Sequence, residues 1–219
     1  MGTRDRIIEA GLQLFNEKGE RAVTTNHIAA HLGISPGNLY YHFRNKQAII
    51  AVLFENYQLR ISETLSLPEG RSIEPGDKLR YLTGVFNEIW AYRFMHRDME
   101  HLLEADPALH EEYRAFFRLC LTRIEAIFTA LGEAGILSVT KQDCHDLALN
   151  TWIIVTSWFS FLKCHLPVQT QNEITQDMLK GGIYQIFCLE RPYLTAEHKE
   201  EMLALQQSFI PQPDWTLGQ

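Results

Sequence analysis

The chain has 219 residues, of which 46% are hydrophobic, and a formal net charge of −7. This composition excludes a disordered protein and favours one large helical domain, or a small domain joined to a larger one. The four cysteines are far apart and no signal-peptide pattern opens the chain, so we expect free thiols and a cytoplasmic protein.

The charge is unevenly distributed along the chain. Residues 1–60 carry seven basic and five acidic side chains, whereas residues 61–219 carry 13 basic and 22 acidic ones. Salt screens exposed charges beyond about 8 Å at physiological ionic strength. The acidic C-terminal part would therefore not prevent the N-terminal part from binding a polyanion such as DNA.

The N-terminal part is predicted to form four helices, because apolar residues recur there at helical spacing and residues that cap helices precede each segment. The next segment, residues 66–77, holds two prolines and two glycines and is predicted to be a loop. The predicted helices and their caps are residues 3–19 (Thr3), 25–33 (Thr24 or Thr25), 36–43 (Ser35) and 47–64 (Asn45).

The remainder of the chain is also predicted to be helical, without strands, and to end in a loose tail over residues 211–219. The longest apolar segment, from Leu147 to Leu162, has 16 residues. A membrane-spanning helix needs about 20, so we expect a buried helix and no membrane partner. The predicted C-terminal helices are residues 79–90, 96–105, 107–134, 141–166, 175–190 and 196–209.

The segment Thr24–Lys46, TTNHIAAHLGISPGNLYYHFRNK, predicts a helix-turn-helix. Ala29 is small where two helices must cross closely, and Gly33 can adopt the left-handed conformation that turns the chain. Five apolar side chains at suitable positions would fill the small core between these helices: Ile28, Leu32, Ile34, Leu39 and Phe43.

The exposed face of the third helix is suited to the major groove of DNA. Gly37 would permit close approach, Asn38 could read base edges, and tyrosines offer apolar contacts and a hydroxyl. Lys46 lies in the first turn of the next helix, where it could hold a phosphate. The exposed residues of the third helix are Pro36, Gly37, Asn38, Tyr40, Tyr41 and His42.

Residues 4–55 resemble the tetracycline-repressor (TetR) family of regulators, through AGLQLFNEKG, TTNHIA, HLGIS and GNLYYHFRNK. The resemblance implies an all-α fold, with a DNA-binding domain over residues 1–46 and a helical effector-binding and dimerisation domain over residues 47–219. It also implies a homodimeric repressor that binds a palindromic operator. His27, His31 and the lack of a basic residue at position 26 depart from the family pattern. The implied DNA-binding residues are Thr25, Asn26, Pro36, Gly37, Asn38, Tyr40, Tyr41, His42 and Lys46.

The C-terminal helices are rich in aromatic residues, which belong either to the core or, as the resemblance implies, to a ligand cavity. Few charges interrupt these faces, so the expected effector is small and apolar or amphipathic. Thr156, Tyr113, His96 and His101 are candidate polar anchors. The predicted ligand-binding residues are Trp90, Phe94, Tyr113, Phe116, Phe117, Cys120, Trp152, Thr156 and Phe159.

The predicted helices over residues 141–166 and 175–190 are the candidates for dimerisation. The first is apolar nearly all round, which requires cover on more than one side, and the second has two adjacent glycines that would allow a partner helix to approach. The predicted dimer-interface residues are Leu147, Thr151, Ile154, Trp158, Gly181, Gly182 and Tyr184.

Three other classes of function were considered. The spacing of histidines and cysteines suits no metal site, and nucleophile, phosphate-loop and HExxH motifs are missing, so we expect no catalysis, cofactor or metal. A redox-responsive regulator acting through Cys120 or Cys164, and a helical adaptor that binds only protein, stay as alternatives.

Overall fold

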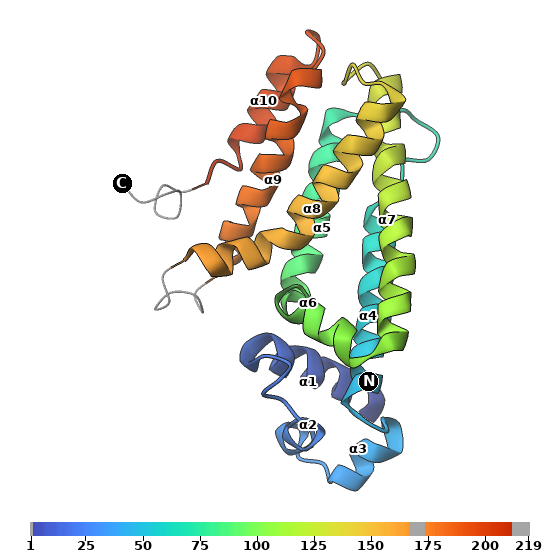
Figure 1. Ribbon diagram of the computed structural model, residues 1–219, viewed down its shortest axis with the longest axis vertical. Coiled ribbons are helices and arrows are strands. Elements are labelled where there is room, and N and C mark those ends of the chain that lie inside the picture. The colour runs from blue at the N-terminus through green and yellow to red at the C-terminus, as the bar shows by residue number, and fades with distance from the viewer. Residues whose placement is uncertain (1, 167–173, 212–219) are drawn as a thin grey trace. The chain divides into compact units, whose positions relative to one another are not determined.

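The computed structural model describes residues 2–166 and 174–211, and these residues form ten α-helices and no strand (Figure 1). The all-α prediction is confirmed. All but Pro211 of the predicted loose tail lies outside the described residues. The helices are α1 (Thr3–Lys18), α2 (Thr25–Leu32), α3 (Pro36–His42), α4 (Lys46–Thr64), α5 (Pro75–Ala91), α6 (Arg93–Ala105), α7 (Pro107–Glu133), α8 (Lys141–His165), α9 (Gln176–Glu190) and α10 (Lys199–Gln207).

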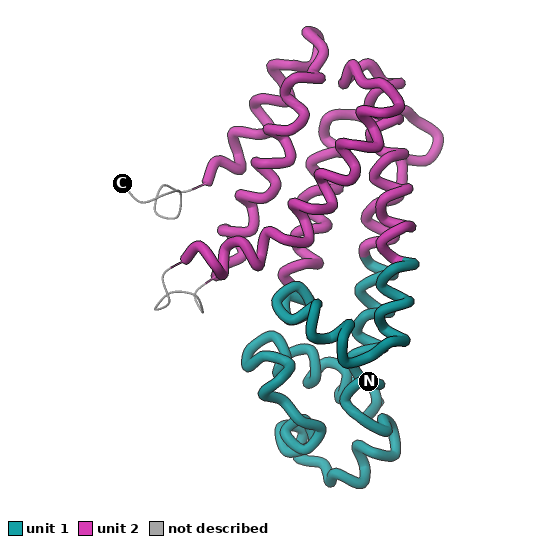
Figure 2. The backbone as a smooth tube through the Cα atoms, in the orientation of Figure 1, with its two compact units in different colours: residues 1–60, 92–115 teal, residues 61–91, 116–219 magenta. Residues whose placement is uncertain are grey.

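The chain forms two compact units (Figure 2). Unit 1 contains residues 1–60 and 92–115, and unit 2 contains residues 61–91 and 116–219. The predicted domain boundary at residue 46 lies inside unit 1, because α6 returns to α1: Asn16 Oδ1 accepts a hydrogen bond from the Phe94 N–H (3.1 Å), and Arg97 Nη2 donates to the Phe15 carbonyl (2.7 Å).

Helices α2, α3 and α4 begin at the predicted caps. Asn45 Oδ1 accepts from the Ala48 N–H (2.9 Å), and Thr140 Oγ1 accepts from the Asp143 N–H (3.1 Å). These bonds satisfy backbone donors that have no partner within the helix. The prediction for Thr3 was wrong, since Gly2 is the N-cap of α1 and Thr3 is its first helical residue.

Three predicted boundaries differ from the structure. The loop predicted over residues 66–77 ends earlier, since α5 begins at Pro75. The Asp77 carboxylate, in the first turn of α5, accepts hydrogen bonds from the Glu74 N–H (2.9 Å) and from Nη1 and Nη2 of Arg71 (2.6 and 2.7 Å). Hydrogen bonding to Arg71 holds the pKa of Asp77 well below its usual value. Helix α6 begins three residues early. Helix α10 begins at Lys199, three residues after the predicted start, because the Thr195 N–H donates a hydrogen bond to the Ile136 carbonyl (3.2 Å) outside the helix.

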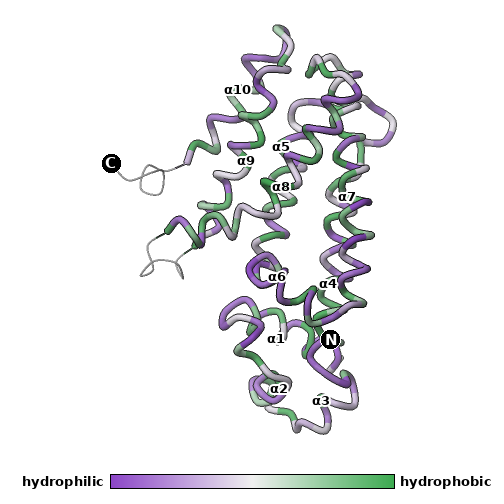
Figure 3. Tube along the Cα trace, in the orientation of Figure 1, coloured by the Kyte–Doolittle hydropathy of each residue, from purple (hydrophilic) through white to green (hydrophobic). Residues whose placement is uncertain are grey.

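Hydrophobic and hydrophilic residues are interspersed along the helices (Figure 3). In unit 2 the apolar face of α8 packs against α9. By length and composition α8 could cross a membrane, alone among the described helices. Its buried side chains, which include Val155 and Phe159, pack inside unit 2. The segment over residues 147–162 is therefore buried on one face only, since Leu149, Ile153 and Phe161 are exposed.

A buried ion pair in unit 2 joins α5 and α9 and was not predicted. Lys78 donates to Glu190, and the two side chains are 4% and 1% exposed. The Lys78 ammonium also lies 5.1 Å from the centre of the Phe128 ring. Burial raises the pKa of Glu190, and the neighbouring Lys78 opposes this shift.

Gly182 is in contact with this chain's own side chains rather than open to a partner. A Cβ at position 182 would lie 2.6 Å from Phe86 Cζ and 3.0 Å from Trp158 Cγ. The glycine therefore permits the close packing of α9 against α5 and α8. The expectation that Gly182 would admit a partner helix is corrected accordingly.

We predict that Gly182→Ala lowers the free energy of unfolding by about 1–3 kcal/mol, because two aromatic rings must shift to admit the methyl group. Gly76→Ala on α5 is the matched control, since its new Cβ would meet no atom within 4 Å. Urea unfolding of both variants tests this, and equal stability of the two would contradict the packing role of Gly182.

Candidate nucleic-acid interface

The turn between α2 and α3 is formed by Gly33, as predicted. Its φ and ψ of 65° and 29° lie in the left-handed region. The Gly33 N–H donates to the Ala30 carbonyl (3.2 Å), and the Ile34 N–H donates to the Ala29 carbonyl (3.0 Å). This pair of bonds is the Schellman arrangement that ends helices at glycine. Ala29 is 1% exposed, so its small side chain lies inside the crossing of the two helices.

Helix α3 is held at its beginning and along its inner face. Ser35 Oγ accepts from the Asn38 N–H (3.2 Å), and Pro36 occupies the first turn. Leu39 and Phe43 are 0% and 4% exposed, and Ile28 of α2 is fully buried. Of the predicted small core, Ile28, Leu39 and Phe43 are buried, whereas Leu32 and Ile34 are half-buried. The buried members fix which face of α3 stays outside.

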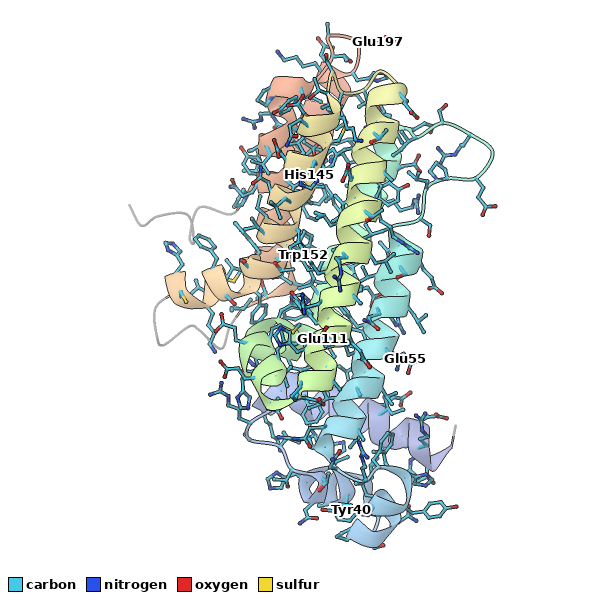
Figure 4. All side chains as sticks on the ribbon, turned by 45° about the vertical axis from the view of Figure 1, so that its right-hand side comes forward. Tyr40, Glu55, Glu111, His145, Trp152 and Glu197 are labelled. Carbon is cyan, nitrogen blue, oxygen red and sulfur yellow. The ribbon has the colours of Figure 1, made fainter. Side chains whose placement is uncertain are left out.

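The outer face of α3 carries the predicted DNA-binding side chains. Tyr41 is 85% exposed and Tyr40 is 50% exposed. Tyr40, labelled on α3 in Figure 4, lies with its hydroxyl 3.2 Å from Thr25 Oγ1 of α2, so the two helices present one connected polar surface. Pro36, Gly37, Asn38 and Asn26 are also exposed, and His42 is half-buried.

Lys46 has a partner that the sequence did not reveal. Its ammonium lies 2.5 Å from Glu20 Oε1 and donates to the Glu20 carbonyl oxygen (3.0 Å). Glu20 is 4% exposed, whereas Lys46 is half-buried. The predicted phosphate contact by Lys46 would therefore compete with an existing ion pair. Glutamate at position 20 has no local sequence signal, because its partner is 26 residues away.

The predicted ligand-binding residues are divided between the units. In unit 1, Phe94 is fully buried with its ring centre 5.2 Å from that of Phe15, and Tyr113 lies 6.3 Å from Phe54. In unit 2, Trp152 of α8, labelled in Figure 4, is the centre of an aromatic cluster with Phe116 and Phe117. The other predicted residues in unit 2 are Trp90, Cys120, Thr156 and Phe159.

Most of the predicted dimer residues pack inside unit 2. The buried residues in this set are Leu147, Thr151 and Trp158 of α8, and Gly181 and Gly182 of α9. Ile154 and Tyr184 are half-buried. The periodicity of α8 did not show which stripe faces inward, because both are apolar. The exposed large apolar side chains of α8 are Leu149, Ile153 and Phe161.

The thiols differ in their surroundings. Cys120 is buried, which raises the pKa of its thiol to about 12, and Cys164 is exposed. A thiol with so high a pKa stays protonated at neutral pH and reacts slowly with oxidants. This disfavours the redox alternative at Cys120.

Taken with its geometry, the α2–α3 unit defines a helix-turn-helix protein of the DNA-binding class. Residues 7–53 match the family model described as bacterial regulatory proteins of the tetR family, and residues 56–202 match the model described as a bacterial transcriptional repressor. The chain belongs to the TetR family of bacterial transcriptional regulators.

Relatives and solved structures agree with this assignment. A class G tetracycline repressor protein of Vibrio anguillarum is 44% identical over 63 residues, which are 29% of this chain and 30% of that protein. The chain thus matches less than a third of that relative. A crystallised TetR-family transcriptional regulator of Marinobacter aquaeolei VT8 is 48% identical, with a TM-score of 0.88 over 96% of this chain and 100% of the other. The complex of SmeT with triclosan shares the fold, with 21% identity and a TM-score of 0.62 over 90% of this chain and 93% of that one.

We predict that Gly33→Ala lowers the free energy of unfolding by about 1–2 kcal/mol, because the left-handed conformation is unfavourable for a residue with a Cβ. No atom lies within 4 Å of the new Cβ, so the loss would come from the backbone alone. Gly33→Asn is the control, since asparagine tolerates this conformation. Chemical unfolding that gave asparagine and alanine the same loss would contradict this origin.

Proposed function

We propose that this chain is a ligand-responsive homodimeric repressor that binds a palindromic operator and is released by a small apolar or amphipathic effector. The observation that carries the proposal is the outer face of α3, where Tyr41 is 85% exposed on a helix fixed by its cap and its buried face. Tyrosine combines an apolar ring with a hydroxyl and is enriched where proteins contact their partners.

The division of roles on DNA follows from side-chain chemistry. Asn38 and Tyr41 would contact base edges in the major groove, where an amide can pair with adenine and an aromatic ring can contact the thymine methyl group. The hydrogen-bonded pair of Thr25 and Tyr40, and Lys46 at the start of α4, would contact phosphates. Phosphate contacts position the protein, and base contacts select the sequence.

Dimerisation would use α8 and α9, through the part of α8 that this chain leaves uncovered. Leu149, Ile153 and Phe161 are 37%, 51% and 47% exposed, and burial of such side chains in a two-fold interface is favourable. A dimer would present two copies of α3 to half-sites about 34 Å apart, which requires a palindromic operator.

The effector would bind in the body of the protein, where Phe116, Phe117 and Trp152 form an aromatic cluster in unit 2. The SmeT–triclosan complex supports small-molecule binding in a protein with this fold. Release requires that the effector prefer a form of the dimer that spaces the two α3 helices wrongly.

We predict that Asn38→Ala and Tyr41→Ala each weaken the free energy of operator binding by about 1–3 kcal/mol. Each variant should also lose its preference among bases at the one base pair that the side chain contacts. Lys46→Ala should weaken binding to all sequences and lower the salt slope by about 1. Selection of bound fragments from the host genome identifies the operator, and anisotropy titrations on it measure these effects.

Gly37→Ala is the control for folding in this set. Its new Cβ would meet only Ser35 Oγ, at 3.9 Å, so protein stability should be kept while DNA affinity falls because the methyl group obstructs close approach. If all these variants lost affinity equally at every sequence, the division between base and phosphate contacts would be wrong.

We predict that Ile153→Asp converts the dimer into a monomer at micromolar concentration, because a buried carboxylate without a partner is strongly unfavourable at an apolar interface. Leu119→Asp on α7 is the matched control, since Leu119 is 43% exposed and lies outside α8 and α9. Sedimentation velocity tests both. Dissociation by both variants, or by neither, would contradict the proposed interface.

A further inference from the structure

Unit 1 contains a hollow of about 270 Å³ that the DNA-binding surface of α2 and α3 does not use. Its polar lining comes from Glu20 in the turn after α1, Lys46 and Gln47 on α4, His101 on α6 and Asp106 before α7. Its apolar lining includes Ile50 and Leu102, which are 3% and 4% exposed. The hollow therefore has one charged end and one apolar wall, as sites for small amphipathic molecules do.

Glu20 is the least usual group in this lining. It is 4% exposed, and its Oε1 accepts from Lys46, but its Oε2 has no hydrogen-bond partner among the described residues. His101 Nε2 lies 3.7 Å from this oxygen, beyond hydrogen-bond distance. Buried polar atoms nearly always have hydrogen-bond partners, so a buried carboxylate oxygen without a donor is unfavourable. His101 is half-buried and lines the hollow beside this carboxylate.

The charges of the hollow select the sign of the ligand. Glu20 and Asp106 contribute two carboxylates and Lys46 contributes one ammonium, so these three side chains together have a net charge of about −1. Asp106 Oδ1 accepts from two backbone N–H groups at the beginning of α7 and stays in place. A monocation would neutralise the site, whereas an anion would be repelled.

We propose that this hollow binds a small organic cation, a primary ammonium on a short aliphatic stem. The ammonium donates to Glu20 Oε2, and the stem lies on Ile50, Leu102 and Leu109, which is 6% exposed. An ammonium has several donors, so it can satisfy Oε2 while it also faces Asp106. The hollow, at about 270 Å³, is slightly smaller than the usual range for ligand pockets, which restricts the stem to a few carbons.

Binding of the cation would change the state of Lys46. A second positive charge on the Glu20 carboxylate repels the Lys46 ammonium and weakens its pair with Oε1. Lys46 is then available to a DNA phosphate, so the cation strengthens DNA binding. This coupling rests on the proposed DNA-binding function, whereas occupancy of the hollow does not.

The binding site is tested without DNA. Full-length isotope-labelled protein is titrated with n-butylammonium chloride, and amide chemical shifts are followed, with n-butanol and sodium butyrate as neutral and anionic probes of similar size. We expect saturable shifts around Glu20, Lys46 and His101 with n-butylammonium alone. Glu20→Gln should weaken binding about ten- to a hundredfold, because a charge-assisted hydrogen bond is lost.

Glu9→Gln is the matched control, because Glu9 is exposed on α1 outside the hollow and the variant loses the same charge. It should bind n-butylammonium as the unmodified chain does. Should Glu20→Gln fail to fold, Ala105→Leu fills the rim of the hollow from an exposed position and should also abolish binding. Equal binding of n-butanol, equal loss in Glu9→Gln, or no saturable shift would overturn the proposal.

The coupling is tested by DNA titrations in which n-butylammonium replaces an equal concentration of sodium. We expect tighter binding with the amine, and in Glu20→Gln tight binding that the amine does not change. Saturable amine binding with unchanged DNA affinity would overturn the coupling through Lys46. An absence of DNA binding under both conditions would overturn the proposed function and leave the binding result standing.

Discussion

Helix α3 has seven residues and would not be stable by itself in water, so the rest of the chain must hold it in place. The left-handed turn at Gly33 sets its direction, the Ser35 hydroxyl satisfies a free N–H at its beginning, and Leu39 anchors it in the core. None of these three constraints uses the outer face of the helix. That face can therefore carry residues such as Tyr41, which is 85% exposed and lies outside this core.

Helix α6 belongs with the DNA-binding helices by its contacts. Arg97 caps the carbonyl end of α1, Asn16 caps the beginning of α6, and His101 lies 3.7 Å from the Glu20 carboxylate. Glu20, in the turn after α1, thus contacts Lys46 of α4 and lies near His101 of α6. A ligand in the hollow would act directly on the helices that position α3, within one compact unit.

Two ion pairs show how burial alters the role of a charge. Lys78 and Glu190 are enclosed in unit 2, with Phe128 beside the ammonium, so nothing from solvent can take the place of either partner. The pair of Lys46 and Glu20 borders a hollow, whereas in both pairs one carboxylate oxygen lacks a hydrogen-bond partner among the described residues. The first arrangement is suited to holding two helices together, and the second to exchanging partners.

The sequence by itself determined what depends on neighbours along the chain: the helix caps, the turn at Gly33, the inward residues of α3 and the family of the protein. The tertiary structure alone decided which stripe of α8 is buried and that Gly182 meets Phe86. It also decided that α6 returns to α1 and that Glu20 meets Lys46. Helical periodicity fixes the spacing of a face but not what covers it, and charges 26 or 112 residues apart become partners only through packing.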